Sequence, residues 1–300
     1  MLTCLMKYIL FLLMFSCAGL AAQDLPEKYA PFGQLIVTPF ASAPFPHPLR
    51  AEGHYYKTNF YSAAEHYSDS RVVLFVPKGF RAGRTTDFVI HFHGWGNTLT
   101  NVLPHYQLIE QFAASRRNAI LVVPQGPVNA SDSFGGKLED EGGLKRFLEE
   151  AVRALKQHDV IKSDHIGRII LSGHSGGYGA VSSAVAWGGL SDHVREVWLW
   201  DALYGNTERF VVWFDHHKGR FVDLYTEHGG TKEESENLMA ALKGNQVPFF
   251  ASNETNISTS VLRENHLVFL FSALPHDEVM QSHQTFRRFL ETSALGEVKQ

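Results

Sequence analysis

The segment 169–187 constrains the fold more than any other part of the chain. An apolar, β-prone run at 169–171 leads into Gly-x-Ser-x-Gly at 173–177, and residues 178–187 have the composition of a helix. In this strand–turn–helix context, Gly-x-Ser-x-Gly holds an exposed serine on a sharp turn. Ser175 is therefore predicted to be a nucleophile, with a Ser- and Gly-rich turn that has no chemistry as the alternative.

The same turn predicts one donor for an oxyanion. Gly176 follows the serine and lies where a helix begins, so its backbone N–H can stabilise negative charge on a reacting carbonyl oxygen. Gly173 and Gly177 lack side chains, which lets the strand and the helix approach each other closely.

Strands alternate with helices from residue 87 onward. Strands are predicted at 88–92, 119–123, 169–171, 197–200, 221–225 and 267–271. Helices with a 3.6-residue apolar period are predicted at 103–113 and 144–155, a capping-box pattern at 231–234 opens another, and a final helix runs from about 277 to 290. The alternation predicts an α/β fold with a mainly parallel central sheet and helices on both of its faces.

The residues before this alternating region are predicted to form strands without helices between them. Residues 54–60 and 71–77 are expected to be two antiparallel strands. Residues 23–50 are Pro-rich and are expected to form an extended arm on the domain, with a short strand at 34–37. With a signal peptide at 1–22, this leaves 51–300 as one catalytic domain, without a large cap domain.

The first 22 residues indicate export. Lys7 precedes an apolar run at 8–15 that is too short to span a bilayer comfortably, and small residues follow up to Ala22. We expect cleavage near Ala22 and a secreted or periplasmic protein without a transmembrane span, with lipid attachment at Cys17 as the alternative. Cys4 and Cys17 are the only cysteines, so the mature chain would have no disulfide, thiol nucleophile or cysteine-ligated metal. A formal net charge of -4 argues against nucleic acid as a partner.

A serine nucleophile needs a base, and position in the fold selects it among 16 histidines. His276 follows the last predicted strand, at the same sheet edge as Ser175, where open α/β sheets bind ligands. It is predicted to be the base, with a surface histidine at a helix start as the alternative. His283 falls inside the predicted final helix, and His174 is expected to face away from the reaction.

Two carboxylates compete for the role of triad acid. Asp201 ends the strand 197–200, and Glu227 follows the strand 221–225. We prefer Asp201, because a carboxylate that ends so apolar a run needs a partner when buried, and a histidine N–H would provide one. A cap on the following helix is the alternative role for Asp201.

The loop after the strand 88–92 is predicted to supply the second oxyanion donor. Gly94 lets the backbone turn, so that the N–H of Trp95 points into the site. His91 and His93 have the spacing of zinc ligands on one face of a strand. The sequence lacks HExxH and an acidic cluster to complete such a site, so we predict no metal and treat both histidines as structural.

With these residues together, the chain resembles the α/β-hydrolase superfamily over roughly 71–292. His93-Gly94, the motif at 173–177, Asp201 and His276 follow the order Ser…Asp…His that this superfamily uses. Within it, the chain is most similar to secreted bacterial serine esterases of the feruloyl-esterase and polyester-depolymerase kind. It departs from them in lacking Gly-x-x-Asp after the penultimate strand, and it has no long inserted cap.

The resemblance implies two-step acyl transfer on a small-molecule or polymer ester, without a cofactor. Three alternatives remain open on the sequence. One is a serine peptidase or amidase acting on peptides or cell-wall material, and another is a noncatalytic binding protein on the same fold. The third is a lipid-anchored surface protein whose mature chain begins at Cys17.

Overall fold

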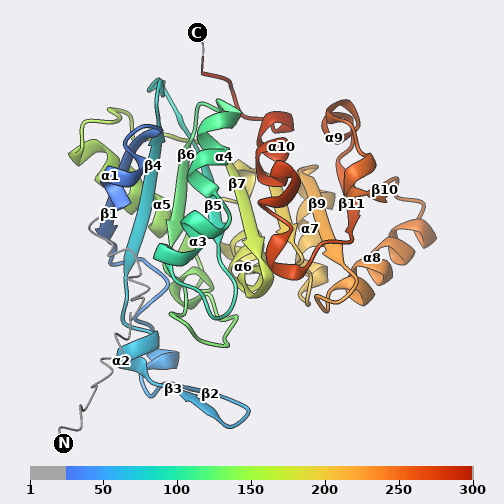
Figure 1. The fold of residues 1–300 in the computed structure, drawn as a ribbon, viewed down its shortest axis with the longest axis horizontal. Coiled ribbons are helices and arrows are strands. Elements are labelled where there is room, and N and C mark those ends of the chain that lie inside the picture. The colour runs from blue at the N-terminus through green and yellow to red at the C-terminus, as the bar shows by residue number, and fades with distance from the viewer. Residues whose placement is uncertain (1–24, 299–300) are drawn as a thin grey trace, which may run out of the picture.

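A nine-stranded sheet forms the centre of the protein (Figure 1). The computed structural model describes residues 25–298. The predicted signal peptide, the cleavage site near Ala22 and the lipid-attachment alternative at Cys17 therefore lie outside the described residues. Among the residues described, no helix is long and apolar enough to cross a membrane.

The strands are arranged in the order β1-β4-β6-β5-β7-β8-β9-β11-β10. Their bounds are β1 (Gly33–Pro39), β4 (Arg71–Pro77), β5 (Thr86–Phe92), β6 (Ile120–Pro124), β7 (Ile166–His174), β8 (Val194–Trp200), β9 (Arg220–Thr226), β10 (Phe250–Asn253) and β11 (Leu267–Ser272). β4 is antiparallel to both β1 and β6, and the other neighbouring pairs are parallel. The prediction of a mainly parallel sheet is confirmed.

Helices cover both faces of the sheet, as predicted. One face packs against α1 (Leu25–Tyr29), α3 (Leu99–His105), α4 (Leu108–Ser115), α9 (Thr259–Glu264) and α10 (Thr285–Thr292). The other packs against α5 (Gly143–Gln157), α6 (Tyr178–Trp187), α7 (Thr207–His217) and α8 (Lys232–Gly244). Figure 1 shows α3, α4 and α10 in front of the sheet.

The second half of strand β8 illustrates why the central strands are largely apolar. Val197 and Leu199 belong to the core under α7, whereas Trp198 and Trp200 belong to the core under α10. Successive side chains of a strand point to opposite faces, and both faces here are covered, so every position from Glu196 to Trp200 is buried. This burial on both faces explains the hydrophobic runs in the sequence.

The segments before β4 differ from their prediction. Residues 54–60 do not form one strand but a hairpin of β2 (His54–Tyr56) and β3 (Asn59–Tyr61), which turns through Lys57 with a φ of 54°. The strand predicted at 34–37 is confirmed and longer, because β1 pairs along its whole length with β4. The hairpin and α2 (Ala63–His66) project beyond the sheet edge at which β7 ends (Figure 1).

Two predicted helices are also corrected. The helix predicted at 103–113 is divided into α3 and α4, because Pro104 weakens the first and Gln107 has a left-handed φ of 49°. The final helix begins at Thr285 rather than near 277. Short 3₁₀ turns at His276–Glu278 and Ser282–Gln284 replace its predicted first half.

Candidate active site

Ser175 stands between the end of β7 and the start of α6. It opens a 3₁₀ turn, is partly exposed, and has a φ of 52°. A left-handed backbone is costly for a residue with a side chain, and such strain is concentrated at functional turns. A Cβ added to Gly177 would lie 2.4 Å from the carbonyl oxygen of Phe92, so a side chain at this position would clash with β5.

His276 and Asp201 lie in contact, although 75 residues separate them. His276 Nδ1 is 2.7 Å from Asp201 Oδ2, the Asp201 side chain is fully buried, and the His276 side chain is 27% exposed. Asp201 follows β8, and His276 follows β11, so both come from the carboxyl ends of parallel strands. Ser175 follows β7 at the same edge, which brings the three residues to one region of the sheet.

Asp201 is surrounded by hydrogen-bond donors. Its carboxylate accepts from the Thr226 N–H at 3.2 Å, from Thr226 Oγ1 at 2.6 Å and from the Thr231 hydroxyl. Burial alone would raise the pKa of this carboxyl, but the hydrogen bonds from His276, Thr226 and Thr231 outweigh it. The pKa of Asp201 is therefore below its ordinary value, and the group is a carboxylate at neutral pH.

The other candidate for the triad acid contacts a lysine and not His276. Glu227 is exposed, and its Oε2 lies 2.7 Å from Lys232 Nζ. The hydrogen bond from Lys232 is the main reason that the pKa of Glu227 is lowered. The structure therefore brings Asp201, and not Glu227, to the ring of His276.

The loop after β5 passes directly beside the serine. A Cβ added to Gly94 would lie 2.5 Å from the Cβ of Ser175 and 3.1 Å from its Oγ. One added to Gly176 would lie 2.5 Å from Cδ1 of Trp95, whose indole N–H donates to Ser133 at 2.7 Å. The loop of Gly94 and Trp95 therefore packs against the turn of Ser175 and Gly176.

The two histidines of β5 and its following loop are engaged with the protein. His93 Nδ1 lies 2.8 Å from the carbonyl oxygen of Gly94, and its Nε2 accepts from the N–H of Gly126 at 2.9 Å. His91 is fully buried, with its Nδ1 2.9 Å from Ser172 Oγ. His93 thus tethers the loop that holds Gly94.

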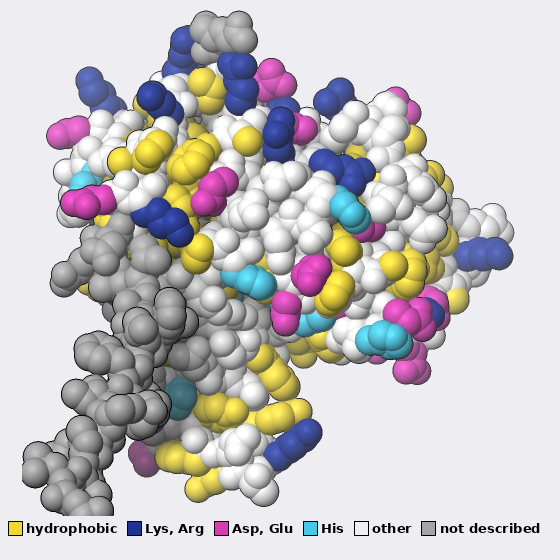
Figure 2. All heavy atoms as spheres, viewed as in Figure 1, with side chains coloured by type: hydrophobic (Ala, Val, Ile, Leu, Met, Phe, Trp, Pro, Cys, Tyr) yellow, Lys and Arg dark blue, Asp and Glu magenta, His cyan; other side chains and the backbone are white. Residues whose placement is uncertain are grey.

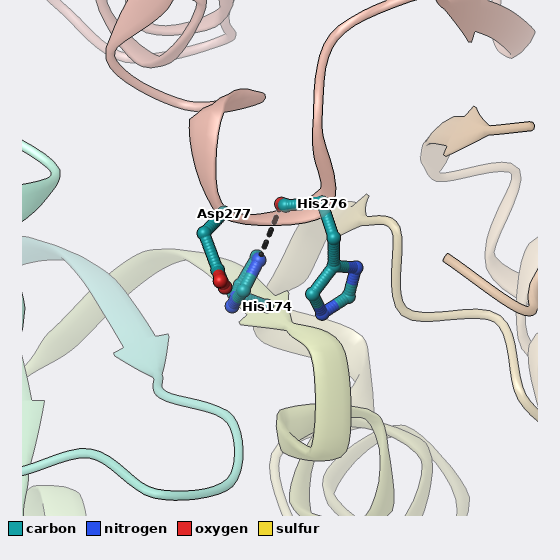
Figure 3. A group of neighbouring side chains, drawn as sticks. All are labelled: His174, His276 and Asp277. Carbon is teal, nitrogen blue, oxygen red and sulfur yellow. Dashed lines mark hydrogen bonds between the residues drawn. The ribbon is translucent and has the colours of Figure 1, made fainter. Parts of the chain in front are cut away.

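A different group comes close enough to share a metal ion in the described part of the chain. It consists of His174, His276 and Asp277 (Figure 3). Both ring nitrogens of His174 are already engaged, Nδ1 with the Tyr106 hydroxyl at 3.1 Å and Nε2 with the His276 carbonyl oxygen at 3.0 Å. A metal ligand needs a free nitrogen lone pair, which this arrangement does not leave.

His174, which we expect from the sequence to face away from the reaction, contacts the predicted base from inside the fold. Its ring is buried and lies 4.7 Å from the ring of His276, centroid to centroid. Its Nε2 points at the backbone of the His276 loop (Figure 3). As the last residue of β7, it reaches the loop after β11 by a tertiary contact that its motif position did not indicate.

Aromatic side chains surround the site. Rings on the β2–β3 hairpin and the loops around Ser175 form what we call the aromatic rim: Tyr56, Trp95 and Tyr204. Tyr55 and Phe60 are also exposed, but they lie on the hairpin face opposite to Tyr56. Tyr56 and Trp95 have ring centroids 4.8 Å apart. Figure 2 shows hydrophobic side chains gathered on this hairpin.

Tyr204 lies against both the acid and the serine. Its hydroxyl donates to the carbonyl oxygen of Gly229. Burial and the negative charge of Asp201 raise the pKa of Tyr204 to about 12, while a hydrogen bond with Ser175 acts in the opposite direction. The phenol therefore stays protonated at neutral pH.

No protein-family model matches this chain, and no curated protein matches its sequence. Solved structures resemble it. FphF, a fluorophosphonate-binding serine hydrolase of Staphylococcus aureus, aligns with a TM-score of 0.51 and 11% identity, over 86% of this chain and 97% of its own. A feruloyl esterase module of Clostridium thermocellum aligns with a TM-score of 0.51 and 10% identity, over 87% and 88%.

A ferulic acid esterase aligns with a TM-score of 0.53 and 13% identity, over 87% of this chain and 98% of that one. Structural similarity at identities this low establishes only the fold, so the activity must be argued from the site. The neighbours are serine hydrolases and esterases, and the chain shares their architecture. This protein has the α/β-hydrolase fold.

Proposed function

We propose that this protein is a serine hydrolase that cleaves carboxylic esters through Ser175, His276 and Asp201. The observation that carries the proposal is the 2.7 Å contact of His276 with the buried Asp201, at the sheet edge where Ser175 stands on a left-handed turn. A histidine oriented by a carboxylate is the base that a serine hydroxyl requires.

The reaction proceeds in two steps. Ser175 Oγ attacks the ester carbonyl while His276 takes its proton, and the resulting imidazolium then protonates the departing alcohol. Water hydrolyses the acyl-enzyme with His276 again as base and then as acid. Asp201 remains a carboxylate throughout and stabilises the imidazolium, consistent with its lowered pKa.

The oxyanion is held by the backbone N–H groups of Trp95 and Gly176. Both residues flank Ser175, and Gly176 lies in the turn that leads into α6. Two N–H donors fixed before the substrate arrives stabilise the developing charge without reorganisation. The hydrogen bonds of His93 to Gly94 and Gly126 keep the Trp95 loop in place.

The substrate is an ester whose acyl or alcohol part has an apolar surface. The aromatic rim presents Trp95 with 39% and Tyr204 with 37% of its surface exposed, and Tyr56 packs against Trp95. Exposed aromatic rings gathered beside a reactive group are typical of a binding surface. A panel of esters with acetyl, butyryl, octanoyl and aryl acyl groups measures which of these the rim prefers.

Export belongs to the same proposal. The apolar run at 8–15 and the small residues up to Ala22 support a signal peptide, and the absence of cysteine after Cys17 suits an oxidising compartment. The N-terminal sequence of the protein recovered from culture medium or periplasm tests this. A mature chain beginning near Gln23 supports export with cleavage, and one beginning at Cys17 contradicts cleavage near Ala22.

The deciding experiment is intact-mass analysis after treatment with a fluorophosphonate probe. The wild type is expected to gain one adduct, Ser175→Ala none, and Ser163→Ala, at the amino end of the sheet, one as in the wild type. The absence of an adduct on folded wild-type protein would overturn the proposal. A p-nitrophenyl ester and the p-nitroanilide of the same acid then separate the activities, since faster cleavage of the amide would contradict an esterase.

A further inference from the structure

The loop that carries His276 is anchored by side chains far from it in sequence. Three of its backbone carbonyls face a donor within residues 25–298: His174 Nε2 lies 3.0 Å from the oxygen of His276, and His105 Nε2 lies 3.0 Å from that of Asp277. Gln111 Nε2 donates to the oxygen of Met280 at 3.2 Å. We propose that His174, with Tyr106 behind it, is a positioning residue that fixes His276 for the reaction, an inference that rests on the proposed function.

The hydrogen bonds determine where the protons lie on this network. The carbonyl oxygen of His276 can only accept, so His174 carries a proton on Nε2. Burial is the main reason that the pKa of His174 is lowered to about 4, so the ring is neutral at pH 7 and Nδ1 has a lone pair that can accept a hydrogen bond. The hydroxyl of Tyr106 donates to that lone pair at 3.1 Å.

His276 is consequently held from two sides. Asp201 orients its Nδ1, whereas His174 holds its backbone and lies against its ring, with the centroids 4.7 Å apart and the planes tilted by 41° (Figure 3). A base on a loop loses catalytic power when its ring shifts, because proton transfer needs close alignment with the serine. A neutral His174 also avoids repelling the imidazolium that forms on His276 during the reaction.

Two substitutions separate the two nitrogens of His174. The amide of His174→Asn takes the place of Nδ1 and can still accept from Tyr106, but it does not reach His276. The longer amide of His174→Gln reaches as far as Nε2 and can donate to the carbonyl oxygen. The two variants therefore differ in the one bond that the proposal invokes.

We expect His174→Asn to lower kcat about 100-fold. Its KM for a p-nitrophenyl ester should stay within about twofold, since the substrate does not touch His174. His174→Gln should recover at least about tenfold of the lost kcat. Rates are referred to active sites counted by fluorophosphonate titration, so that misfolded protein does not enter them.

Equal kcat values for the two variants would overturn the proposal, whether both match the wild type or both fall together. Tyr106→Phe should have a smaller effect, because the carbonyl of His276 still selects the Nε2–H form of His174. Failure of the proposed function has a different signature, namely a wild type that neither turns over esters nor takes up the probe.

A measurement on the unmodified protein covers the case in which the variants do not fold. Two-dimensional ¹H–¹⁵N NMR of the histidine rings distinguishes a nitrogen that carries a proton from one that does not. At pH 7 we expect His174 to be neutral, protonated on Nε2 and unprotonated on Nδ1. A proton on Nδ1 of His174 would overturn the proposal without any substitution.

Discussion

Among residues 25–298, two histidines pair with buried carboxylates, and one of these pairs lies beside Ser175. His276 Nδ1 is 2.7 Å from Asp201, and His283 Nδ1 is 3.0 Å from Glu254. Both carboxylates are nearly inaccessible to solvent. By distance and burial the two pairs are alike, so neither property identifies a catalytic dyad.

The pairs differ in their surroundings. Asp201 accepts from Thr226 and Thr231 in addition to His276, and it directly follows a central strand. Glu254 accepts from Ser272, and within the described chain its Oε2 is buried without a partner. Arg288 of α10 donates to the Glu254 backbone at 3.2 Å, so this pair joins the β10 segment to the last helix. The comparison indicates one pair prepared for chemistry and one that links two segments.

Removing the imidazole of each pair should give the largest difference in activity between the two pairs. His276→Ala is expected to lower kcat for a p-nitrophenyl ester by about 10⁶-fold, because the serine then has no base. His283→Ala should leave kcat within about twofold and reduce stability by about 1 kcal/mol. Steady-state kinetics and thermal melts measure both, and a large fall in kcat for His283→Ala at an unchanged melting temperature would contradict the comparison.

Neutralising the carboxylates should give the next largest difference. Asp201→Asn is expected to lower kcat by about 10⁴-fold, because an amide neither stabilises the imidazolium nor selects the correct tautomer of His276. Glu254→Gln and Glu227→Gln serve as controls, and both should retain kcat within about twofold. If Glu227→Gln lost as much activity as Asp201→Asn, the assignment of the acid would be wrong.

The sequence predicts those site residues that follow the end of a strand. Ser175, Asp201 and His276 each follow an apolar run, and parallel strands bring their carboxyl ends to one edge. The placement of these residues follows from that pattern. Their roles remain predictions until the variants are measured.

The supporting contacts were not predictable in the same way, because they depend on the packed fold. Thr231 fits a capping box in sequence, yet its side chain makes no cap and donates to Asp201 instead. His174 was expected to face away, and it anchors a loop 102 residues distant. The final helix begins late because His283 and Gln284 have left-handed backbones, which local periodicity does not reveal.

The contact between Gly94 and Ser175 gives a smaller, steric test. A methyl group at Gly94 would lie 2.5 Å from the Cβ of Ser175, so Gly94→Ala must displace the serine or the loop of Trp95. We expect kcat to fall about 100-fold, as for a misplaced reacting group. Gly205→Ala is the matched control, since nothing lies within 4 Å of a Cβ at that position. Unchanged kcat in Gly94→Ala would show that this loop does not limit the reaction.

A third buried carboxyl, without a histidine, completes the comparison. Asp223 of β9 accepts one hydrogen bond, from Ser235 at 2.6 Å, and its Oδ1 has no partner within the described residues. Burial, with a smaller contribution from the charge of Asp201, raises the pKa of Asp223 from 3.8 to about 7. Because Asp223 accepts few hydrogen bonds, its carboxyl keeps its proton up to about pH 7. Asp201 accepts several hydrogen bonds and is ionised at that pH.

The two carboxyls should therefore act on stability in opposite directions and in separate pH ranges. Between about pH 4 and 7 folded Asp223 holds a proton that the unfolded chain has released, so its contribution to the free energy of unfolding falls as pH rises. Asp201 contributes stability above the pKa of its unfolded state and loses it as the pH drops below about 4.

Asp223→Asn removes the first of these contributions. Urea unfolding of variant and wild type at pH 5 and pH 8 should show the difference in their free energies of unfolding shifting by about 3 kcal/mol in favour of the variant at pH 8. Any pH-independent cost of the new amide cancels between the two pH values. An unchanged difference would mean that Asp223 is already ionised in the fold at pH 5, and that donor count does not separate the two carboxyls.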